Sequence, residues 1–418
     1  MIKAITGTKD ILPSEISKWY FLENTVRNIF VNYNYKEIRT PVFEETLLFA
    51  RSIGEETDIV GKEMYSFVDR SDTSITLKPE MTAGVVRAYI EHSLGKQQSL
   101  NKLFYIAPMF RQEKPQAGRL RQFHQFGGEV LGSKSMTLDA ELIGIAFFIL
   151  KDLGLKDLTV KINTMGVPEE RAGYRMILRE YLLDKKNDLS EDSRKRFETN
   201  ILRIFDSKAE SDREIMKNAP LLIDYIEDES KGDFEKVKEL LNKLSIPYIV
   251  DPTLVRGLDY YTKTTFEIIS GKVGSQSALV GGGRYDLLVE QLGGNPTPGV
   301  GFAAGIERIL LACENENSLN IPADKIDLYI VQLDKGLTNE VVFTALGFRQ
   351  KNLSVDFDYL DRSVKAQMRE ANKLNARFVL FLGGEEYKFG KVNLKNMKSG
   401  EQKEFSLKAV DEMIKTIS

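Results

Sequence analysis

The sequence has 418 residues with an ordinary globular composition, 42% hydrophobic and 28% charged, so we expect two or three domains rather than one core. The formal net charge of −3 excludes a molecule that attracts nucleic acid as a whole, and any RNA contact must come from local basic patches. One cysteine, Cys313, excludes an internal disulfide framework, and only two histidines, His92 and His124, argue against a zinc site built by the protein.

The first predicted elements are a helix and a strand near the N-terminus. Apolar residues recur at helical spacing over residues 14–33, and Ser14 after Pro13 is the expected N-cap. A strand reading YKEIRTPVF follows and ends at Pro41, because proline cannot donate to a strand ladder. These residues alone indicate a helix packed beside an edge strand.

A hairpin and a strand-to-helix junction come next. Residues 64–77 predict two strands that turn at Ser71–Asp72. Directly after them, KPEMTAGVVRAYI places Glu80 and Thr82 where a helix begins. Thr82 is consistent with a helix cap and Glu80 with a solvated acid of the first turn, and a ligand-binding role is the alternative left open.

The stretch from Phe104 to Gly132, FYIAPMFRQEKPQAGRLRQFHQFGGEVLG, predicts a long antiparallel hairpin. Two apolar runs of strand character flank a polar loop that contains Pro115 and Gly118. The loop also carries four cations: Arg111, Lys114, Arg119 and Arg121. The tip of the hairpin is therefore expected to be a flexible, positively charged arm.

Alternation along the two strands groups the polar side chains by face. Arg111 and Glu113 fall on one face of the first strand, and the second strand presents Phe123, Gln125 and Glu129 on one face. Guanidinium and carboxylate groups aimed at one sheet surface suit a ligand that carries phosphate and ammonium groups. A basic surface hairpin with structural ion pairs is the alternative that these residues leave open.

The sequence FRQE, a loop and RQFHQFGGEVLG together resemble motif 2 of the class II aminoacyl-tRNA synthetases, in the form found in the histidyl-tRNA synthetase family. The resemblance implies an α+β fold: an antiparallel β-sheet catalytic domain flanked by helices, a helical insertion, and a C-terminal α/β anticodon-binding domain. The N-terminal helix and strand are similar to motif 1, which implies a homodimer. Glu80 and Thr82 would then hold the α-ammonium of the amino acid. The family more often has glycine where Met81 stands.

The middle of the chain changes character twice. Residues 137–153 predict an apolar helix closed by Gly154, and DLTVKIN predicts a strand. From about residue 168 to 245 the chain is charged and helical, whereas both flanks are rich in strands. We interpret this segment as an inserted module with solvated charged faces; by the resemblance, it would instead clamp the acceptor arm of tRNA.

Residues 251–269, DPTLVRGLDYYTKTTFEII, place an arginine, an acid and two tyrosines around a turn before a β-rich run. A folded turn with a stacked cation would explain these residues. The segment also resembles a motif of the histidyl-tRNA synthetases, LVRGLDYY followed by T-x-F-E. The resemblance implies that Arg256 contacts the ATP α-phosphate and the substrate carboxylate, while Tyr260 and Tyr261 line the histidine pocket.

Two glycine-containing runs follow. ALVGGGRYDLLVEQLGG sets Gly281 to Gly283 ahead of a helix and matches neither a dinucleotide fingerprint nor a P-loop. A strand bulge explains the glycines, although the family uses this run as part of the floor of the histidine pocket. PGVGFAAGIERILLA predicts a strand leading into a helix that bears Arg308. It resembles motif 3, where this arginine grips the ATP γ-phosphate; a surface arginine is the alternative.

Beyond Pro322 strands alternate with helices, which predicts a small three-layer α/β domain. The run GEEYKFGKVNLKNMKSGEQ resembles the anticodon-binding domain of several class II synthetases. We therefore expect a catalytic domain over residues 1–322, with its insertion at about 168–245, and an anticodon-binding domain over residues 323–418.

The resemblance implies a histidine–tRNA ligase, which activates L-histidine with ATP to histidyl-adenylate and then transfers histidine to the 3′ end of tRNA(His). In the first step a carboxylate attacks an anionic phosphate, so fixed cations must neutralise the charge, with Mg²⁺ on the departing pyrophosphate. Arg111 and Arg256 are the candidates at the α-phosphate, and Arg119 and Arg308 at the γ-phosphate. Phe123 would stack on adenine.

Selection of histidine implies polar partners for an imidazole. Glu129 would accept its N–H, with Tyr261 hydrogen-bonded beside the carboxylate, and Gln125 would assist at the ammonium group. The expected histidine-binding residues are Glu80, Thr82, Arg111, Gln125, Glu129, Arg256, Tyr260 and Tyr261. The expected ATP-binding residues are Arg111, Glu113, Arg119, Phe123 and Arg308. Lys114 and Gln116 are weaker candidates for contact with the tRNA acceptor.

No apolar run approaches the roughly 20 residues that span a bilayer, and the N-terminus lacks the apolar core of a secretory signal, so we expect a cytoplasmic protein. The alternative function is that of a non-catalytic, histidine-sensing regulatory paralogue of ATP phosphoribosyltransferase. That paralogue lacks the anticodon domain and often loses the phosphate-binding arginines. This sequence has both the domain beyond Pro322 and the arginines Arg111, Arg256 and Arg308, which favours the enzyme.

Overall fold

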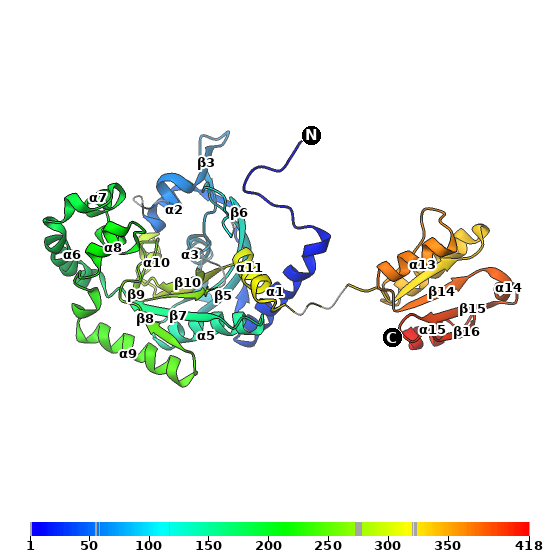
Figure 1. The fold of residues 1–418 in the computed structure, drawn as a ribbon. Helices are drawn as coiled ribbons and strands as arrows, with labels where there is room; N and C mark the ends of the chain where they lie inside the picture. Colours follow the sequence, from blue (N-terminus) through cyan, green and yellow to red (C-terminus); the bar gives the residue numbers. More distant parts are fainter. Residues whose placement is uncertain are drawn as a thin grey trace. The chain divides into compact units, whose positions relative to one another are not determined.

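The computed structural model describes residues 2–54, 57, 59–116, 118–271, 278–319, 321 and 324–417. The chain forms two compact units, Met1–Leu319 and Asn320–Ser418 (Figure 1). Pro322, where we expected the domain boundary, lies outside the described residues. Within the described part of the chain, no helix has the length and apolar character needed to cross a membrane.

An eight-stranded sheet organises the first unit, in the order β1-β5-β6-β11-β10-β9-β7-β8. Its strands, in that order, are Lys36–Glu37, Asn101–Phe110, Gln122–Leu131, Gly299–Gly305, Ala278–Arg284, Thr262–Ser270, Leu158–Thr164 and Tyr248–Val250. The five inner pairings are antiparallel, and the outermost pairing at each edge, β1 with β5 and β7 with β8, is parallel. This antiparallel-rich sheet with flanking helices confirms the expected α+β fold class.

The predicted hairpin is formed by β5 and β6, in a register that runs from Asn101 opposite Leu131 to Phe110 opposite Gln122. Both strands are long because apolar side chains alternate along them and enter the core on one face. One detail of the prediction is wrong. Arg111 and Glu113 do not belong to the first strand but lie beyond its end, in the connection to β6.

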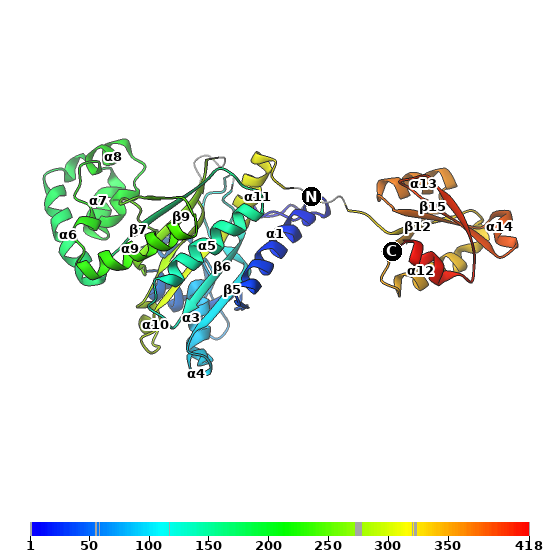
Figure 2. The ribbon, with the colours of Figure 1, turned by 90° about the horizontal axis from the view of Figure 1, so that it is seen from below.

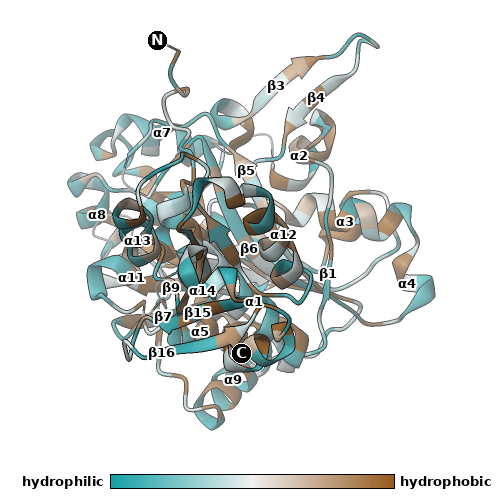
Figure 3. Ribbon diagram, turned by 90° about the vertical axis from the view of Figure 1, so that its right-hand side faces the viewer, coloured by the Kyte–Doolittle hydropathy of each residue, from teal (hydrophilic) through white to brown (hydrophobic). Residues whose placement is uncertain are grey.

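The strand expected over YKEIRTPVF is interrupted over residues 38–42, a gap that contains Pro41. Only β1 joins the large sheet, whereas β2 (Phe43–Glu45) belongs to a separate three-stranded sheet with β4 (Ser74–Leu77) and β3 (Tyr65–Val68). The latter two strands form the hairpin predicted over residues 64–77, and Asp72 in its turn has a φ of 62°. This hairpin projects from the rest of its unit (Figure 3).

Helices α1 (Pro13–Asn32), α5 (Thr137–Asp152) and α9 (Asp228–Lys243) lie side by side against one face of the large sheet (Figure 2). Their apolar residues and the sheet share one core, in which the ring of Phe30 stacks on Phe104 at 4.8 Å between centroids. Helix α1 begins at Pro13, so the residue at the N-cap position is Leu12 and the expected cap at Ser14 is wrong. Pro13 suits this place because its missing N–H would have had no helical partner.

The remaining helices of the sheet region are short or flank the site. They are α2 (Thr46–Ile53), a π-helical turn (Ile59–Glu63), α3 (Thr82–Glu91), α4 (Leu94–Gln97), α10 (Leu288–Gln291) and α11 (Ile306–Glu316). Helices α2, α3 and α10 pack on one another, and α11 packs on β6. Residues at the start of α3 (Thr82) and at the start of α11 (Glu307 and Arg308) line the same cavity.

The helical segment between β7 and β8 has a core of its own, built around Tyr174, Leu178 and Phe197. Its elements are α6 (Pro168–Leu183), α7 (Glu191–Glu198), α8 (Glu210–Met216), α9 and three short 3₁₀ turns (Lys186–Asp188, Ile201–Asp206 and Leu222–Asp224). Inside it, the buried carboxylate of Asp212 accepts hydrogen bonds from three serine hydroxyls at 2.5–2.6 Å: Ser190, Ser193 and Ser207. These bonds fix the turns that face the sheet.

The second unit contains a five-stranded sheet in the order β13-β12-β14-β15-β16. Its elements are β12 (Leu328–Gln332), a 3₁₀ turn (Lys335–Leu337), α12 (Thr338–Arg349), β13 (Val355–Phe357), α13 (Val364–Lys373), β14 (Phe378–Leu382), α14 (Gly384–Lys388), β15 (Lys391–Asn396), β16 (Gln402–Ser406) and α15 (Val410–Ile417). Two separate apolar clusters, one with α12 and α15 and one with α13, cover the sheet. This arrangement agrees with the predicted three layers.

Candidate active site

The large sheet, the start of α3 and the helical segment surround a cavity of about 730 Å³. Most of the site residues expected from the sequence line it: Glu80, Thr82, Arg111, Glu113, Arg119, Phe123, Gln125, Arg256, Tyr260, Tyr261 and Arg308. Glu129, Lys114 and Gln116 are not among its described lining residues. The cavity thus gathers residues that are separated by more than half of the chain.

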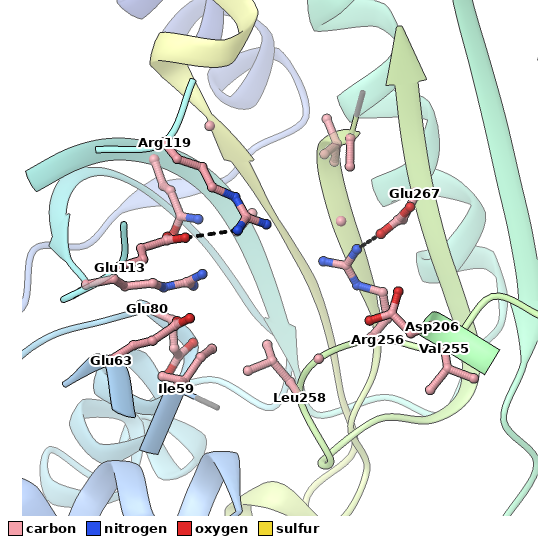
Figure 4. A pocket seen from close by; sticks show the side chains of 18 of the residues that line it. Ile59, Glu63, Glu80, Glu113, Arg119, Asp206, Val255, Arg256, Leu258 and Glu267 are labelled. Atoms are coloured by element: carbon pink, nitrogen blue, oxygen red, sulfur yellow. Dashed lines mark hydrogen bonds and ion pairs between the residues drawn. The ribbon is translucent and has the colours of Figure 1, made fainter. Parts of the chain in front are cut away.

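Six of the described arginines line this cavity, and the four expected from the sequence reach it from three separate places in the chain. Arg111 and Arg119 come from the connection between β5 and β6, Arg256 from the loop before β9, and Arg308 from the first turn of α11. Figure 4 shows Arg119 and Arg256 pointing into the cavity from opposite sides. Arg111 lies over the ring of Phe123, with 5.4 Å from its Cζ to the ring centroid.

Contacts with the backbone fix two of these arginines. The Nε of Arg111 donates to the Pro79 carbonyl at 2.9 Å. Arg308 donates from Nε to the Gly118 carbonyl at 2.9 Å and from Nη1 to the Ala278 carbonyl at 3.0 Å. Both side chains are therefore oriented by the protein itself, with further N–H groups left for a ligand.

Positive charge is concentrated on this side of the cavity. Burial, together with the neighbouring Arg119 and Arg111, lowers the pKa of Arg308 to about 10. Glu113 offsets part of the charge through an ion pair with Arg119 at 3.2 Å. The mutual repulsion of the guanidiniums is relieved when an anion binds, so this part of the cavity is suited to a polyanion such as a triphosphate.

Arg256 occupies the opposite wall and forms an ion pair with Glu267 on β9 (Figure 4). Its guanidinium lies against Gly281 of β10, where a Cβ would overlap the Nη2 atom. Gly281 to Gly283 lie inside β10 and precede the short helix α10, and the register of β10 with β9 shifts between Gly283 and Arg284, as expected for the strand bulge that the sequence left open. The missing side chain at Gly281 makes room for Arg256.

Glu80 is buried immediately before α3. Its carboxylate accepts hydrogen bonds from the backbone N–H groups of Thr82 at 2.7 Å and Ala83 at 2.9 Å, and burial raises its pKa. Glu80 therefore caps the helix, so the alternatives of a solvated acid at Glu80 and a cap at Thr82 are both wrong. The hydroxyl of Thr82 donates to Glu129 at 2.7 Å instead.

Glu129 lies on β6 beneath the cavity, fully buried. Its carboxylate accepts hydrogen bonds from Thr82 and from the hydroxyl of Tyr285, and burial raises its pKa to about 8. Gly301 stands opposite it on β11, where a Cβ would collide with the carboxylate. The expected bond from Tyr261 is wrong, since the bonded tyrosine is Tyr285. In the sequence, the only indication that Tyr285 belongs to the site was its position directly after the GGGR run.

The rings of Tyr260 and Tyr261 lie 4.7 Å apart between centroids, and both side chains are almost fully buried. Side chains of the helical segment hold this loop: Nη1 of Arg171 donates to the Tyr261 carbonyl at 2.5 Å, and Nδ2 of Asn200 donates to the Asp259 carboxylate at 2.7 Å. Burial raises the pKa of Tyr261 to about 12, so its phenol stays protonated near neutral pH. The tyrosines form the apolar end of the cavity.

The far wall belongs to the helical segment and was not identified from the sequence. Its lining residues are Ser190, Asp192, Arg196, Arg203, Asp206, Ser207, Lys208 and Ala209. Charges are distributed along all helices of this segment, so no spacing distinguishes the residues that face the cavity. Lys114 and Gln116 are exposed, and the backbone of Gln116 pairs with that of Arg119 at the hairpin tip.

Among the described residues, no group of three or more His, Cys, Asp or Glu side chains is placed to hold a metal ion. The site thus offers guanidiniums for anions at one end and a buried carboxylate with aromatic rings at the other. Such a cavity can hold two charged molecules and bring a carboxylate against a phosphate.

Comparison with known proteins gives the same indication along the whole chain. The family model described as "Histidyl-tRNA synthetase" matches residues 7–309, and the model described as "Anticodon binding domain" matches residues 327–417. The histidine–tRNA ligase of Caldanaerobacter subterraneus subsp. tengcongensis is 50% identical over 99% of this chain and 100% of its own length. That of a Thermoanaerobacter species (strain X514) is 48% identical over the full length of both. The crystal structure of apo S. aureus histidyl-tRNA synthetase superposes with a TM-score of 0.84, at 40% identity and 99% coverage of both chains.

Proposed function

Because the chain belongs to the histidyl-tRNA synthetase family, we propose that its cavity is the place where histidine and ATP react. The chain is an ATP-dependent histidine–tRNA ligase, which activates L-histidine to histidyl-adenylate and then transfers histidine to the 3′ end of tRNA(His). Relatives with this activity match the full length, and an anticodon-binding domain is present. Both facts favour the ligase over a regulatory paralogue of ATP phosphoribosyltransferase.

The convergence of Arg111, Arg119, Arg256 and Arg308 on one cavity is the observation that carries the assignment of the site. The histidine carboxylate that attacks the α-phosphate meets like charge in a site of reduced dielectric. Arg111 and Arg256 neutralise this charge, and Arg119 and Arg308 hold the γ-phosphate. Since protein contacts already orient these side chains, they stabilise the transition state without further reorganisation.

Residues on the same wall of the cavity supply the remaining contacts with ATP. Phe123 of β6 lines the cavity, and its ring provides a surface on which adenine stacks. Mg²⁺ enters as the complex with ATP and leaves with pyrophosphate. A hydrated Mg²⁺ needs one or two carboxylates rather than a protein cage, and Glu113 lines the cavity beside Arg119.

Histidine occupies the end of the cavity below Arg256. The α-ammonium group meets Glu80, Thr82 and Gln125, of which the Gln125 carbonyl oxygen is buried and has no hydrogen-bond partner within the described residues. The imidazole lies against Tyr260 and Tyr261, and its N–H is directed toward Glu129. No side chain is required as a general base in this step, because the attacking carboxylate is already ionised.

Transfer to tRNA(His) needs further contacts. We assign the acceptor end to the mouth of the cavity, between the exposed hairpin tip with Lys114 and Gln116 and the helical segment over about residues 168–245. We further propose that the active molecule is a cytoplasmic homodimer joined through the N-terminal helix and strand. Catalysis belongs to residues 1–322 and anticodon recognition to residues 323–418.

The test is histidine-dependent exchange of labelled pyrophosphate into ATP, followed by charging of tRNA(His). Arg256→Ala should lower kcat for exchange about 100-fold or more, because it removes a cation fixed at the reacting phosphate. Arg87→Ala is the matched control: this arginine is similarly buried, 25% against 22% exposed, but pairs with Glu44 outside the cavity. Equal kcat values for the two variants would remove Arg256 from the site. Exchange without charging would contradict the tRNA step.

A further inference from the structure

Arg256 presents only part of its guanidinium to other protein groups. Its Nη1 donates to Oε1 of Glu267, and its buried Nε has no hydrogen-bond partner within the described part of the chain. Nε and Nη2 form the edge of a guanidinium that binds two oxygens of one anion side by side. On this edge Nε has no hydrogen-bond partner within the described part of the chain, whereas Nη1 at the opposite corner is held by Glu267.

The place of Glu267 in the sheet explains how the corner is held. Glu267 lies on β9 directly opposite Gly281 of β10, and the Arg256 guanidinium lies over that glycine. On the other side, the cross-strand neighbour of Glu267 is Lys161 of β7, which is bound to Asp251 at 2.8 Å. Among the described residues, Arg256 is therefore the only ion-pair partner of Glu267.

We propose that Glu267 is the positioning residue of Arg256: it fixes the guanidinium so that the Nε–Nη2 edge faces the reacting phosphate and carboxylate. This inference rests on the proposed role of Arg256. Arginine has a long side chain that loses much rotamer freedom when it is held in one place. A strand residue supplies a rigid anchor for that purpose, because β9 is paired on both sides.

We expect the loss of Glu267 to lower kcat. If Glu267 only orients a group that acts in the transition state, its loss lowers kcat and leaves the binding of the ground-state substrates nearly unchanged. Misplacing a catalytic group by about 1 Å can cost about 100-fold. Glu267→Gln should accordingly lower kcat for pyrophosphate exchange by about 10- to 100-fold, with KM for histidine and ATP changed less than about threefold.

A double-mutant cycle separates positioning from a merely structural role. In the Arg256→Ala background, Glu267→Gln should cause no further loss of kcat, because the residue acts only through Arg256. Glu141→Gln is the matched control. It removes an ion pair with Lys102 of similar exposure that lies away from the cavity, and should leave kcat within about twofold of the parent. Independent losses that add in the double variant would overturn the proposal, as would a loss confined to KM.

Thermal unfolding of each variant identifies a failure to fold. If Glu267→Gln does not fold, Glu267→Asp carries the same cycle, because it keeps the charge but withdraws it by one methylene. The outcomes also separate this inference from the function on which it rests. An active Arg256→Ala variant would refute the proposed role of Arg256. An inactive Arg256→Ala with a fully active Glu267→Gln would refute only the role of Glu267.

Discussion

Replacing Glu129 by glutamine should remove a pH-dependent decrease in the free energy of unfolding. Burial raises the pKa of Glu129 from its ordinary value of 4.5 to about 8, although Tyr285 and Thr82 donate to the carboxylate. Between these two pKa values the folded chain keeps a proton that the unfolded chain has lost. The contribution of Glu129 to the free energy of unfolding is therefore most favourable below pH 4.5 and falls as the pH rises to about 8.

The size of the effect follows from the two pKa values. A gap of about 3.5 pH units, at about 1.4 kcal/mol for each, amounts to about 5 kcal/mol when the pH is well above 8. Glutamine keeps the shape of the side chain and an acceptor oxygen for one of the two hydroxyl bonds, but it cannot ionise. The stability of Glu129→Gln relative to the parent should thus increase by about 2 kcal/mol between about pH 6 and about pH 8.

Denaturant unfolding followed by tryptophan fluorescence measures this difference. Trp19 is the only tryptophan in the sequence, and it packs edge-to-face on His124 at 4.9 Å in the same unit as Glu129. The signal therefore reports that unit alone. Saturating histidine should recover stability in the parent at about pH 8 and not in the variant, since the imidazole N–H supplies a donor to the charged carboxylate. Parallel pH profiles for parent and variant would refute the reasoning.

Three further substitutions test other parts of the site. Arg308→Ala should lower kcat/KM for ATP in pyrophosphate exchange about 100-fold or more, because a γ-phosphate cation is lost; an unchanged value would contradict that assignment. Gly281→Ala should lower kcat about 10-fold or more, since its Cβ would displace Arg256, and a parental kcat would refute this packing. Asp139→Asn should lower the free energy of unfolding by about 3 kcal/mol, because the fully buried Arg284 loses one of its two carboxylate partners and keeps only Asp286. An unchanged denaturation midpoint would argue against the importance of that pair.

Local patterns predicted the elements better than their contacts. The β5–β6 hairpin could be recognised because alternation within each strand and a turn-rich connection are properties of neighbouring residues. The strand over YKEIRTPVF was overextended because Pro41 divides it between two sheets, and sheet membership depends on distant partners. The N-cap of α1 was misplaced by two residues, at Ser14 instead of Leu12, since Pro13 and Ser14 are both acceptable at a helix start.

The composition of the cavity could be predicted only where a family motif marked a residue. Arg256 and Arg308 are 52 positions apart in number and have no local pattern that brings them together, and only the resemblance placed them in one site. The bond from Tyr285 to Glu129 and the pair of Glu267 with Arg256 depend on which strands become neighbours. The far wall, with Asp206 and Lys208, depends on how the helical segment packs.

The position of β11 in the sheet bears on the protein while it is still being made. This strand is inserted between β6 and β10, and it is the last of the eight to be synthesised. A growing chain whose residues up to Arg308 are still inside the ribosome lacks both β11 and the last arginine of the cavity. If the proposed site is correct, we expect a chain to react with ATP only after β11 and Arg308 have left the ribosome.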